Sequence, residues 1–155
     1  MIRIRRAGPA DLKGILGLLE AAGLPGEGVE EHLARFLVAE EDGRLLATAG
    51  LEMGEACALL RSVAVEPSAR GTGLGIEIVR QALRFARSAG AREVYLLTES
   101  ADSFFLRFGF GPALRAEIEA LFPRSSQTRQ GGSCASAKTM VLRDLSRVTA
   151  PMPRP

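Results

Sequence analysis

Residues 59–85 combine an apolar strand, a glycine-rich turn and the start of a helix. The strand ends at Val65, Pro67 interrupts it, and apolar residues return at helical spacing from Ile76 onward. The intervening turn carries one arginine and three glycines: Arg70, Gly71, Gly73 and Gly75. A turn that leads into a helix leaves several backbone N–H groups without an intrahelical partner. Because these groups and the helix dipole favour negative charge, the sequence predicts an anion-binding turn here.

Three kinds of phosphate site use a turn of this type. A P-loop requires Gly-Lys-Ser/Thr after four spacer residues, and the lysines of this chain, Lys13 and Lys138, lie elsewhere, so it is excluded. A dinucleotide fingerprint requires Gly-x-Gly-x-x-Gly after the first strand of a βαβ unit. Residues 71–75 read Gly-Thr-Gly-Leu-Gly in the middle of the chain, which is the wrong spacing. The pyrophosphate of a coenzyme A molecule remains as the third alternative.

Two motifs in order identify a family resemblance. Arg70, Gly73 and Gly75 form an Arg-x-x-Gly-x-Gly pattern directly after the strand, and residues 101–110 read ADSFFLRFGF. Together they resemble the acetyl-CoA signature and the later A-x-x-F-Y-x-x-x-G-F segment of the GNAT superfamily of N-acetyltransferases. The resemblance implies an α/β (α+β) fold with a mixed, mostly antiparallel sheet of about 6–7 strands, about four helices and splayed strands around the cofactor.

Periodicity alone predicts most elements in that order. We expect a first helix that Pro9 opens and Gly23 ends, a short second helix over 29–34, a long helix from Ile76 to Gly90, and a helix over 116–122. The expected strands are 2–6, 36–40, 45–53, 57–65, 92–98 and 137–145. Residues 123–133 are expected to form a polar loop, and residues 146–155 a flexible tail after a single domain of residues 1–145.

Composition excludes several classes of protein. With 155 residues, 46% of them hydrophobic and 25% charged, the chain is an ordinary globular domain. A net charge of +2 is too small to favour nucleic acid. Cys57 and Cys134 are too few for a disulfide framework and lack metal-ligand spacing with His32, so we expect no metal and a reducing cytoplasm. Neither a signal peptide nor a membrane-spanning run is evident, which predicts a soluble protein.

The resemblance implies which residues hold acetyl-CoA. The turn would bind the pyrophosphate, and the edge of residues 63–65, opposite residues 96–98, would pair with the pantetheine arm. A backbone N–H near Val63 or Val65 would stabilise the tetrahedral intermediate as an oxyanion hole does. The amine would attack directly, without an acyl-enzyme. The implied cofactor-binding residues are Val63, Ala64, Val65, Arg70, Gly71, Thr72, Gly73, Leu74, Gly75 and Ile76.

The proton donor departs from the family pattern. Many members place a tyrosine where this chain has Phe105, and Thr98 stands at a position where the family has asparagine. Tyr95 lies in the preceding strand and does not replace the missing hydroxyl. The candidates for protonating the leaving thiolate are therefore Thr98, Ser103 and solvent.

Acceptor chemistry points to four further side chains. An alkylammonium must lose a proton before it attacks, and Glu52 is the predicted base, with Glu99 in reserve and a solvated strand carboxylate as the alternative. Arg61 stands among apolar residues and needs an anion: an acceptor carboxylate, or an internal salt bridge for which Glu52 is a candidate. Because Val63 follows Arg61 by two positions, we expect the two side chains on the same face of the strand. His32 is a candidate acceptor contact, or else a surface histidine.

The resemblance extends to a small bacterial subgroup named arsenic-resistance N-acetyltransferases. It rests on residues 50–52 and 59–65, the Phe104-Phe105 pair, and residues 134–137 with Met140. The implied function is acetyl-CoA-dependent acetylation of a small-molecule amine, amino-acid-like or arsenic-resistance-linked. The alternative is an acyl-CoA-binding sensor or weakly catalytic interaction module of the same fold. Homodimers are common in the family. Cys134 is expected to be a small packed residue rather than a metalloid ligand.

Overall fold

The computed structural model describes residues 1–128 and 137–146. Its strands are β1 Arg3–Arg6, β2 Phe36–Glu41, β3 Arg44–Met53, β4 Cys57–Val65, β5 Glu93–Thr98, β6 Gly111–Pro112 and β7 Lys138–Leu142. Its α-helices are α1 Leu12–Ala21, α2 Leu74–Ser88, α3 Asp102–Leu106 and α4 Arg115–Leu121. Short 3-10 helices cover Pro9–Asp11, Leu33–Arg35 and Pro67–Ala69.

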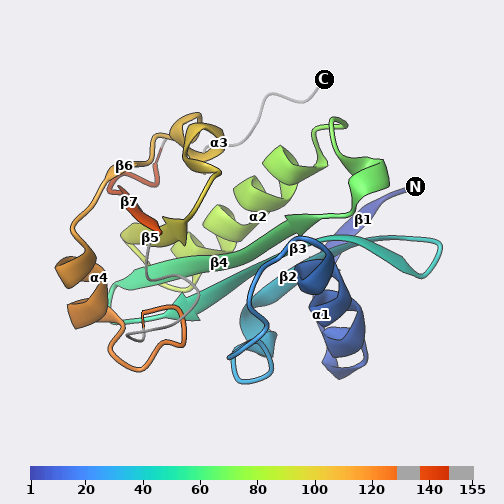
Figure 1. Cartoon of the computed structure of the whole chain (residues 1–155), viewed down its shortest axis with the longest axis horizontal. Coiled ribbons are helices and arrows are strands. Elements are labelled where there is room, and N and C mark those ends of the chain that lie inside the picture. Colours follow the sequence, from blue (N-terminus) through green and yellow to red (C-terminus); the bar gives the residue numbers. More distant parts are fainter. Residues whose placement is uncertain (129–136, 147–155) are drawn as a thin grey trace.

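The strands form one seven-stranded sheet in the order β1-β2-β3-β4-β5-β7-β6 (Figure 1). Its described strand pairs are antiparallel except β4–β5, which is parallel. The expected mixed, mostly antiparallel sheet with four helices is thereby confirmed. No helix in the described ranges is long and apolar enough to cross a membrane.

Alternating side chains give the sheet two apolar faces. Along β2, Leu37 and Ala39 pack in the cluster that contains the buried residues of α2, whereas Phe36 and Val38 pack with α1. A third cluster joins α4 to β4, β5 and β7. One face is therefore covered by α2, and the other by α1 and α4, which lie apart from each other along the sheet (Figure 1).

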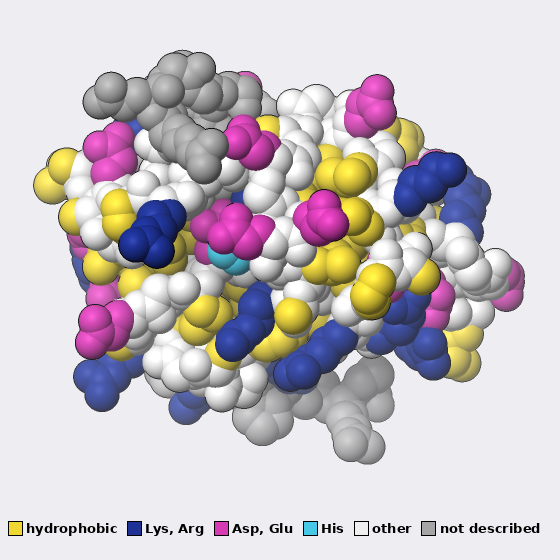
Figure 2. All heavy atoms as spheres, turned by 90° about the horizontal axis from the view of Figure 1, so that it is seen from below, with side chains coloured by type: hydrophobic (Ala, Val, Ile, Leu, Met, Phe, Trp, Pro, Cys, Tyr) yellow, Lys and Arg dark blue, Asp and Glu magenta, His cyan; other side chains and the backbone are white. Residues whose placement is uncertain are grey.

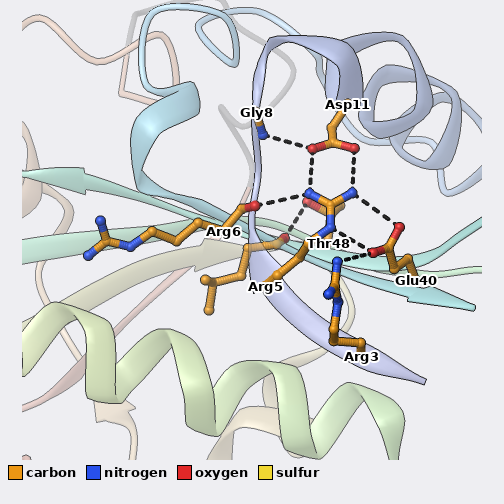
Figure 3. A network of polar contacts seen from close by, with 8 residues as sticks. Arg3, Arg5, Arg6, Gly8, Asp11, Glu40 and Thr48 are labelled. Carbon is orange, nitrogen blue, oxygen red and sulfur yellow. Dashed lines mark hydrogen bonds and ion pairs between the residues drawn. The ribbon is translucent and has the colours of Figure 1, made fainter. Parts of the chain in front are cut away.

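A polar network anchors the start of the chain. Arg5 donates from Nη1 and Nη2 to the two carboxylate oxygens of Asp11, at 2.8 and 2.9 Å, and from Nε to Glu40 at 2.9 Å (Figure 3). Asp11 also accepts a hydrogen bond from the Gly8 backbone N–H at 2.7 Å. These contacts tie β1 to β2 and to the start of α1.

One expectation about the loops is wrong, and a second is confirmed for the part that the structure describes. Residues 29–34, expected as a helix, form turns and the 3-10 helix Leu33–Arg35. Gly28, with φ of 84°, starts this segment in a left-handed conformation, and one buried side chain, Val29, is too little apolar surface to hold a short helix. The described part of the expected polar loop, residues 123–128, forms turns as predicted, with Ser125, Gln127 and Thr128 buried.

A β-bulge in β4 reverses the expected direction of Arg61. β3 and β4 pair at Thr48–Ala64 and at Gly50–Arg61, so β4 carries one extra residue, and Ser62 takes the positive φ of 57°. Val63 packs on the α2 face, while the Arg61 side chain contacts segments on the other face. The expectation that both share one face is wrong because the extra residue shifts the alternation.

Candidate functional site

β4 and β5 separate partway along their length. Their parallel pairing begins at Cys57–Glu93 and ends at Leu60–Leu96, whereas β4 continues to Val65 and β5 to Thr98. The opening leads into a cleft of about 460 Å³. The residues that line it are 22–25, 60–65, 70, 75, 96–101, 104, 105, 127 and 137. The apex of the opening lies at Arg61, and its other end reaches the glycine-rich turn.

The glycine-rich turn presents bare backbone at the start of α2. Gly71 and Gly73 have φ of 79° and 86°, and a Cβ added at either would meet nothing within 4 Å. Within the described part of the chain, no acceptor is bonded to the backbone N–H groups of residues 71–76. A left-handed turn at a helix start thus leaves its N–H groups available to an anion.

Two arginines flank this turn. A second hollow, of about 260 Å³, is lined by residues 65, 69–71, 73, 75, 76, 104 and 107. Arg70 is exposed and its Nε donates to the Val65 carbonyl at 3.2 Å. The Arg107 guanidinium lies 5.1 Å from the centre of the Phe104 ring. The hollow therefore combines backbone donors with fixed positive charge, which suits phosphate groups.

Most residues predicted to bind the cofactor lie at these two cavities. Val63, Ala64, Val65, Arg70 and Gly75 line the cleft, and Gly71, Gly73 and Ile76 line the second hollow. Thr72 and Leu74 line neither: the Thr72 hydroxyl donates to the Ala69 carbonyl at 2.6 Å, and Leu74 is buried. The binding roles stay predictions.

Arg61 and Glu52 form a buried ion pair. Arg61 Nη1 lies 2.8 Å from Glu52 Oε2, and the side chains expose 0% and 5% of their surfaces. Ser125 Oγ donates to the same Glu52 oxygen at 3.0 Å, and His32 Nε2 lies 3.5 Å from Oε1. Of the two partners expected for Arg61, the internal salt bridge is therefore present. Figure 2 shows the histidine of the chain at the surface beside acidic side chains.

The candidates for proton donation are spread apart. Thr98 lines the cleft, and its Oγ1 accepts a hydrogen bond from the Ala101 N–H at 3.0 Å. Ser103 is exposed on α3, outside the cleft lining, and the reserve base Glu99 is exposed within it. The catalytic roles of these residues stay predictions.

Two aromatic residues at β5 and α3 are structural in their contacts. Phe105 is 6% exposed and packs edge-to-face on Phe104 and Phe110. The Tyr95 hydroxyl donates to Glu117 Oε1 on α4 at 2.6 Å, away from the cleft. Burial, reinforced by the Glu117 carboxylate, raises the pKa of Tyr95 to about 12. Tyr95 therefore stays protonated and does not supply the hydroxyl that Phe105 lacks.

Sequence reasoning missed one of the two segments at the apex of the cleft, residues 125–127. Gln127 and residues 23–25 line the cleft, and Ser125 reaches Glu52 from 73 positions away. Neither segment carries a recognisable motif. No group of three or more His, Cys, Asp or Glu side chains able to hold a metal occurs in residues 1–128 and 137–146. Cys57 is buried, and Cys134 lies outside the described residues.

Comparisons with a family model and with known proteins point to the same family. Residues 18–110 match the model of the acetyltransferase (GNAT) family. Over 126 residues the chain is 30% identical to the amino-acid acetyltransferase of Aeromonas salmonicida, covering 76% of this chain and 28% of that one. It is 32% identical over 138 residues to that of Edwardsiella ictaluri, covering 81% and 30%. The chain thus spans less than a third of the length of these relatives.

Two solved structures of acetyltransferases resemble this chain. The N-acetylglutamate synthase of Neisseria gonorrhoeae, complexed with coenzyme A and N-acetyl-glutamate, matches with a TM-score of 0.79 and 26% identity over 92% of this chain and 35% of that one. A GNAT family acetyltransferase from Brucella melitensis in complex with acetyl-CoA matches with a TM-score of 0.61 and 28% identity, covering 72% and 83%.

Proposed function

The chain belongs to the acetyltransferase (GNAT) family, and from that membership we propose that it transfers the acetyl group of acetyl-CoA to the amine of a small, amino-acid-like molecule. One observation carries the proposal: the opening between β4 and β5 and the glycine-rich turn lie at the same end of β4. Acetyl-CoA carries a pyrophosphate, an amide-bearing arm and a thioester in sequence. The turn, the free strand edge and the cleft follow one another in the same order.

Backbone and arginine groups account for donor binding in this proposal. The N–H groups of residues 71–76 bind the pyrophosphate, with charge from Arg70 and Arg107. The edge of residues 63–65, which has no strand partner on the β5 side among the described residues, pairs with the amides of the arm. Glycine at 71 and 73 lets the phosphates approach the backbone, because neither residue has a Cβ and the space that a Cβ would enter is open to 4 Å among the described residues.

The transfer itself needs polarisation of the thioester and two proton movements. The amine nitrogen bonds to the carbonyl carbon, negative charge collects on the carbonyl oxygen, and the carbon–sulfur bond breaks to release a thiolate. A backbone N–H near Val63 or Val65 stabilises the oxygen. The acceptor ammonium gives up a proton; of the two predicted bases, Glu99 lines the cleft and Glu52 does not. The thiolate gains a proton from Thr98, Ser103 or water.

The acceptor class is supported by the relatives rather than by a contact in this chain. The named relatives are amino-acid acetyltransferases, and the Neisseria gonorrhoeae synthase was solved with N-acetyl-glutamate. An amino acid is therefore the proposed acceptor. Membership of the arsenic-resistance subgroup, an arsenic-linked acceptor, a bacterial source, a cytoplasmic location and a homodimer stay predictions.

A second candidate function is an acyl-CoA-binding sensor or a weakly catalytic interaction module. Phe105 favours it, because this side chain lines the cleft, is almost fully buried and carries no hydroxyl. In that case the chain would bind acetyl-CoA without rapid transfer.

Incubation with acetyl-CoA and a panel of amino acids separates the two candidates. Mass spectrometry of the products and titration of released thiol should show N-acetylation of at least one amino acid, with one thiol released per product. A reaction without acceptor controls for hydrolysis. Binding of acetyl-CoA with no product from any amine would support the sensor, and absence of binding would contradict both candidates.

A further inference from the structure

We infer that Glu52 and Arg61 are a positioning pair, which fixes the two segments closing the apex of the cleft, and that neither side chain contacts the acceptor. The inference rests on the proposed function only in treating that apex as the acceptor end. It starts from the bulge at Ser62, which turns Arg61 away from the face that Val63 occupies. The guanidinium thereby contacts the segment that follows α1, at Glu27, and the segment that follows α4, at Ser126.

The guanidinium of Arg61 joins residues from distant parts of the chain. Nε donates to Ser62 Oγ at 3.0 Å, and Nη2 donates to the Glu27 carbonyl oxygen at 2.5 Å. Nη1 donates to Glu52 Oε2 at 2.8 Å and to Ser126 Oγ at 3.3 Å. With no exposed surface and protein acceptors on all three nitrogens, the side chain is used for internal contacts.

The residues bonded to Arg61 adjoin those that line the cleft. Glu27 follows Pro25, and Ser126 precedes Gln127; both Pro25 and Gln127 line the cleft. Ser126 Oγ also donates to the Glu27 carbonyl at 2.9 Å, so the two segments meet on the same atom that Arg61 binds. Loss of the guanidinium therefore releases both walls.

Glu52 holds the second wall from the other side. Its Oε2 accepts from Arg61 and from Ser125 Oγ, and Ser125 Oγ in turn accepts from the Gln127 N–H at 3.1 Å. Its Oε1 faces His32 Nε2. Both carboxylate oxygens thus face protein groups, and neither Glu52 nor His32 lies in the cleft lining.

Gly28 shows that the loop is fitted closely to the guanidinium. A Cβ at this position would lie 2.8 Å from Arg61 Nη1 and 2.8 Å from Ser126 Oγ, and its φ is 84°. Such contact distances leave no space for a carboxylate between the loop and Arg61. The loop is packed on Arg61 as a structural partner.

Steady-state kinetics with two matched acceptors test the inference. Arg61→Met is compared with wild type on an accepted amino acid and on its α-carboxamide, which lacks the carboxylate. We expect KM to rise at least about tenfold for both acceptors, with kcat within about threefold and acetyl-CoA affinity within about twofold. Arg5→Met, which removes a similarly multidentate arginine away from the cleft, should leave both KM values unchanged.

Two outcomes overturn the inference. A KM increase confined to the carboxylate-bearing acceptor would mean that Arg61 binds the acceptor directly, and an unchanged KM for both would mean that it does not position the walls. Arg61→Lys should give an intermediate KM, because a lysine keeps the charge but cannot donate in three directions at once.

Hydrogen exchange tests the inference without an acceptor, and it can be measured on a variant that leaves the buried ion pair intact. Ser126→Ala removes a contact of the pair without burying an unpaired charge. We expect the backbone amides of residues 22–28 and 125–128 to exchange at least about tenfold faster in Ser126→Ala and Arg61→Met, with α2 unchanged. Exchange identical to wild type overturns the inference. Faster exchange in a protein that acetylates no amino acid would refute the proposed function and leave the positioning pair standing.

Discussion

Glu52 is the residue at which a chemical role and a structural role separate most clearly. A general base contributes about 10²–10⁴-fold to rate, and its loss slows the chemical step. A positioning residue acts through the walls, so its loss raises the acceptor KM. Because Glu52 is nearly buried and bonded to Arg61 and Ser125, the contacts favour the second role.

We therefore expect Glu52→Gln to raise the acceptor KM about tenfold, with kcat within about threefold of the wild-type value. The substitution also leaves the Arg61 charge without a counter-ion, and breaking a buried pair typically costs about 3–5 kcal/mol. Initial-rate kinetics and denaturant unfolding measure the two effects. Glu40→Gln, in the network of Arg5, is the matched control and should leave KM unchanged. If the turnover rate instead fell by about a hundredfold or more, Glu52 would be established as the base.

Cys57 is a second residue whose surroundings decide its chemistry. Burial, and secondarily the carboxylates of Glu93 and Glu55, raises the pKa of its thiol above the usual 9.0. A raised thiol pKa lowers the thiolate fraction at neutral pH, and the thiolate is the reactive and metal-binding form. Cys57 is therefore expected to be inert in the folded protein.

In a Cys134→Ser background, we expect a disulfide reagent at pH 8 to leave Cys57 unmodified over minutes and to label it fully once denaturant is added. Absorbance of the released thiolate follows both reactions. Rapid labelling of the folded variant would show that the thiol is accessible and would reopen direct metalloid binding.

At the scale of elements, the Arg5 network couples the anchoring of α1 to pH. Hydrogen bonds from Arg5 lower the pKa of Asp11 below its usual 3.8 and that of Glu40 below its usual 4.5. A carboxyl whose folded-state pKa is depressed adds stability above its unfolded-state pKa, and that stability is lost as pH falls through the folded-state value. The network should therefore stabilise the fold at neutral pH and weaken below about pH 4.

Arg5→Met should lower Tm at pH 7, and the difference from wild type should shrink by pH 3. Thermal unfolding followed by circular dichroism at the two pH values measures this. Arg3→Met, which removes a more exposed arginine bonded to Glu40, should give a smaller difference. A Tm difference that is equal at both pH values would contradict the linkage to Asp11 and Glu40.

Among the elements, the ones with local signals were predictable. β4 was predicted with the bounds that the structure has, because apolar residues, Pro67 and the glycine turn mark it in sequence. The bulge at Ser62 was not predictable, because a serine at positive φ carries no local signal and the register shift between β3 and β4 that accompanies it is a property of the strand pairing. The face of Arg61 was therefore predicted wrongly although the strand was right.

At the scale of the whole molecule, the glycine-rich turn before α2 was predictable, and the contacts of residues 125–127 were not. The turn and the parting of β4 from β5 lie close to the motif that identifies them. The apex of the cleft depends on contacts such as Ser125 to Glu52, which join segments that carry no motif and lie far apart in the sequence. The prediction of a helix over residues 29–34 was wrong for the same reason. Whether a short segment forms a helix depends on the apolar surface that it buries, and the fold determines that surface.

Calorimetric titration with acetyl-CoA tests most directly the central claim, that the turn and the β4–β5 opening form the donor site. Gly75→Glu places a carboxylate beside the turn in ordinary helical backbone, where a Cβ would lie no closer than 3.4 Å to Val65, whereas Gly73, with φ of 86°, would be strained by any side chain. Gly111→Glu on β6 adds the same charge in open space far along the sheet.

We expect wild type and Gly111→Glu to bind acetyl-CoA equally, and Gly75→Glu to bind at least about 30-fold more weakly while keeping its fold by circular dichroism. No binding by wild type, or equal binding by all three proteins, would contradict the assignment of the donor site.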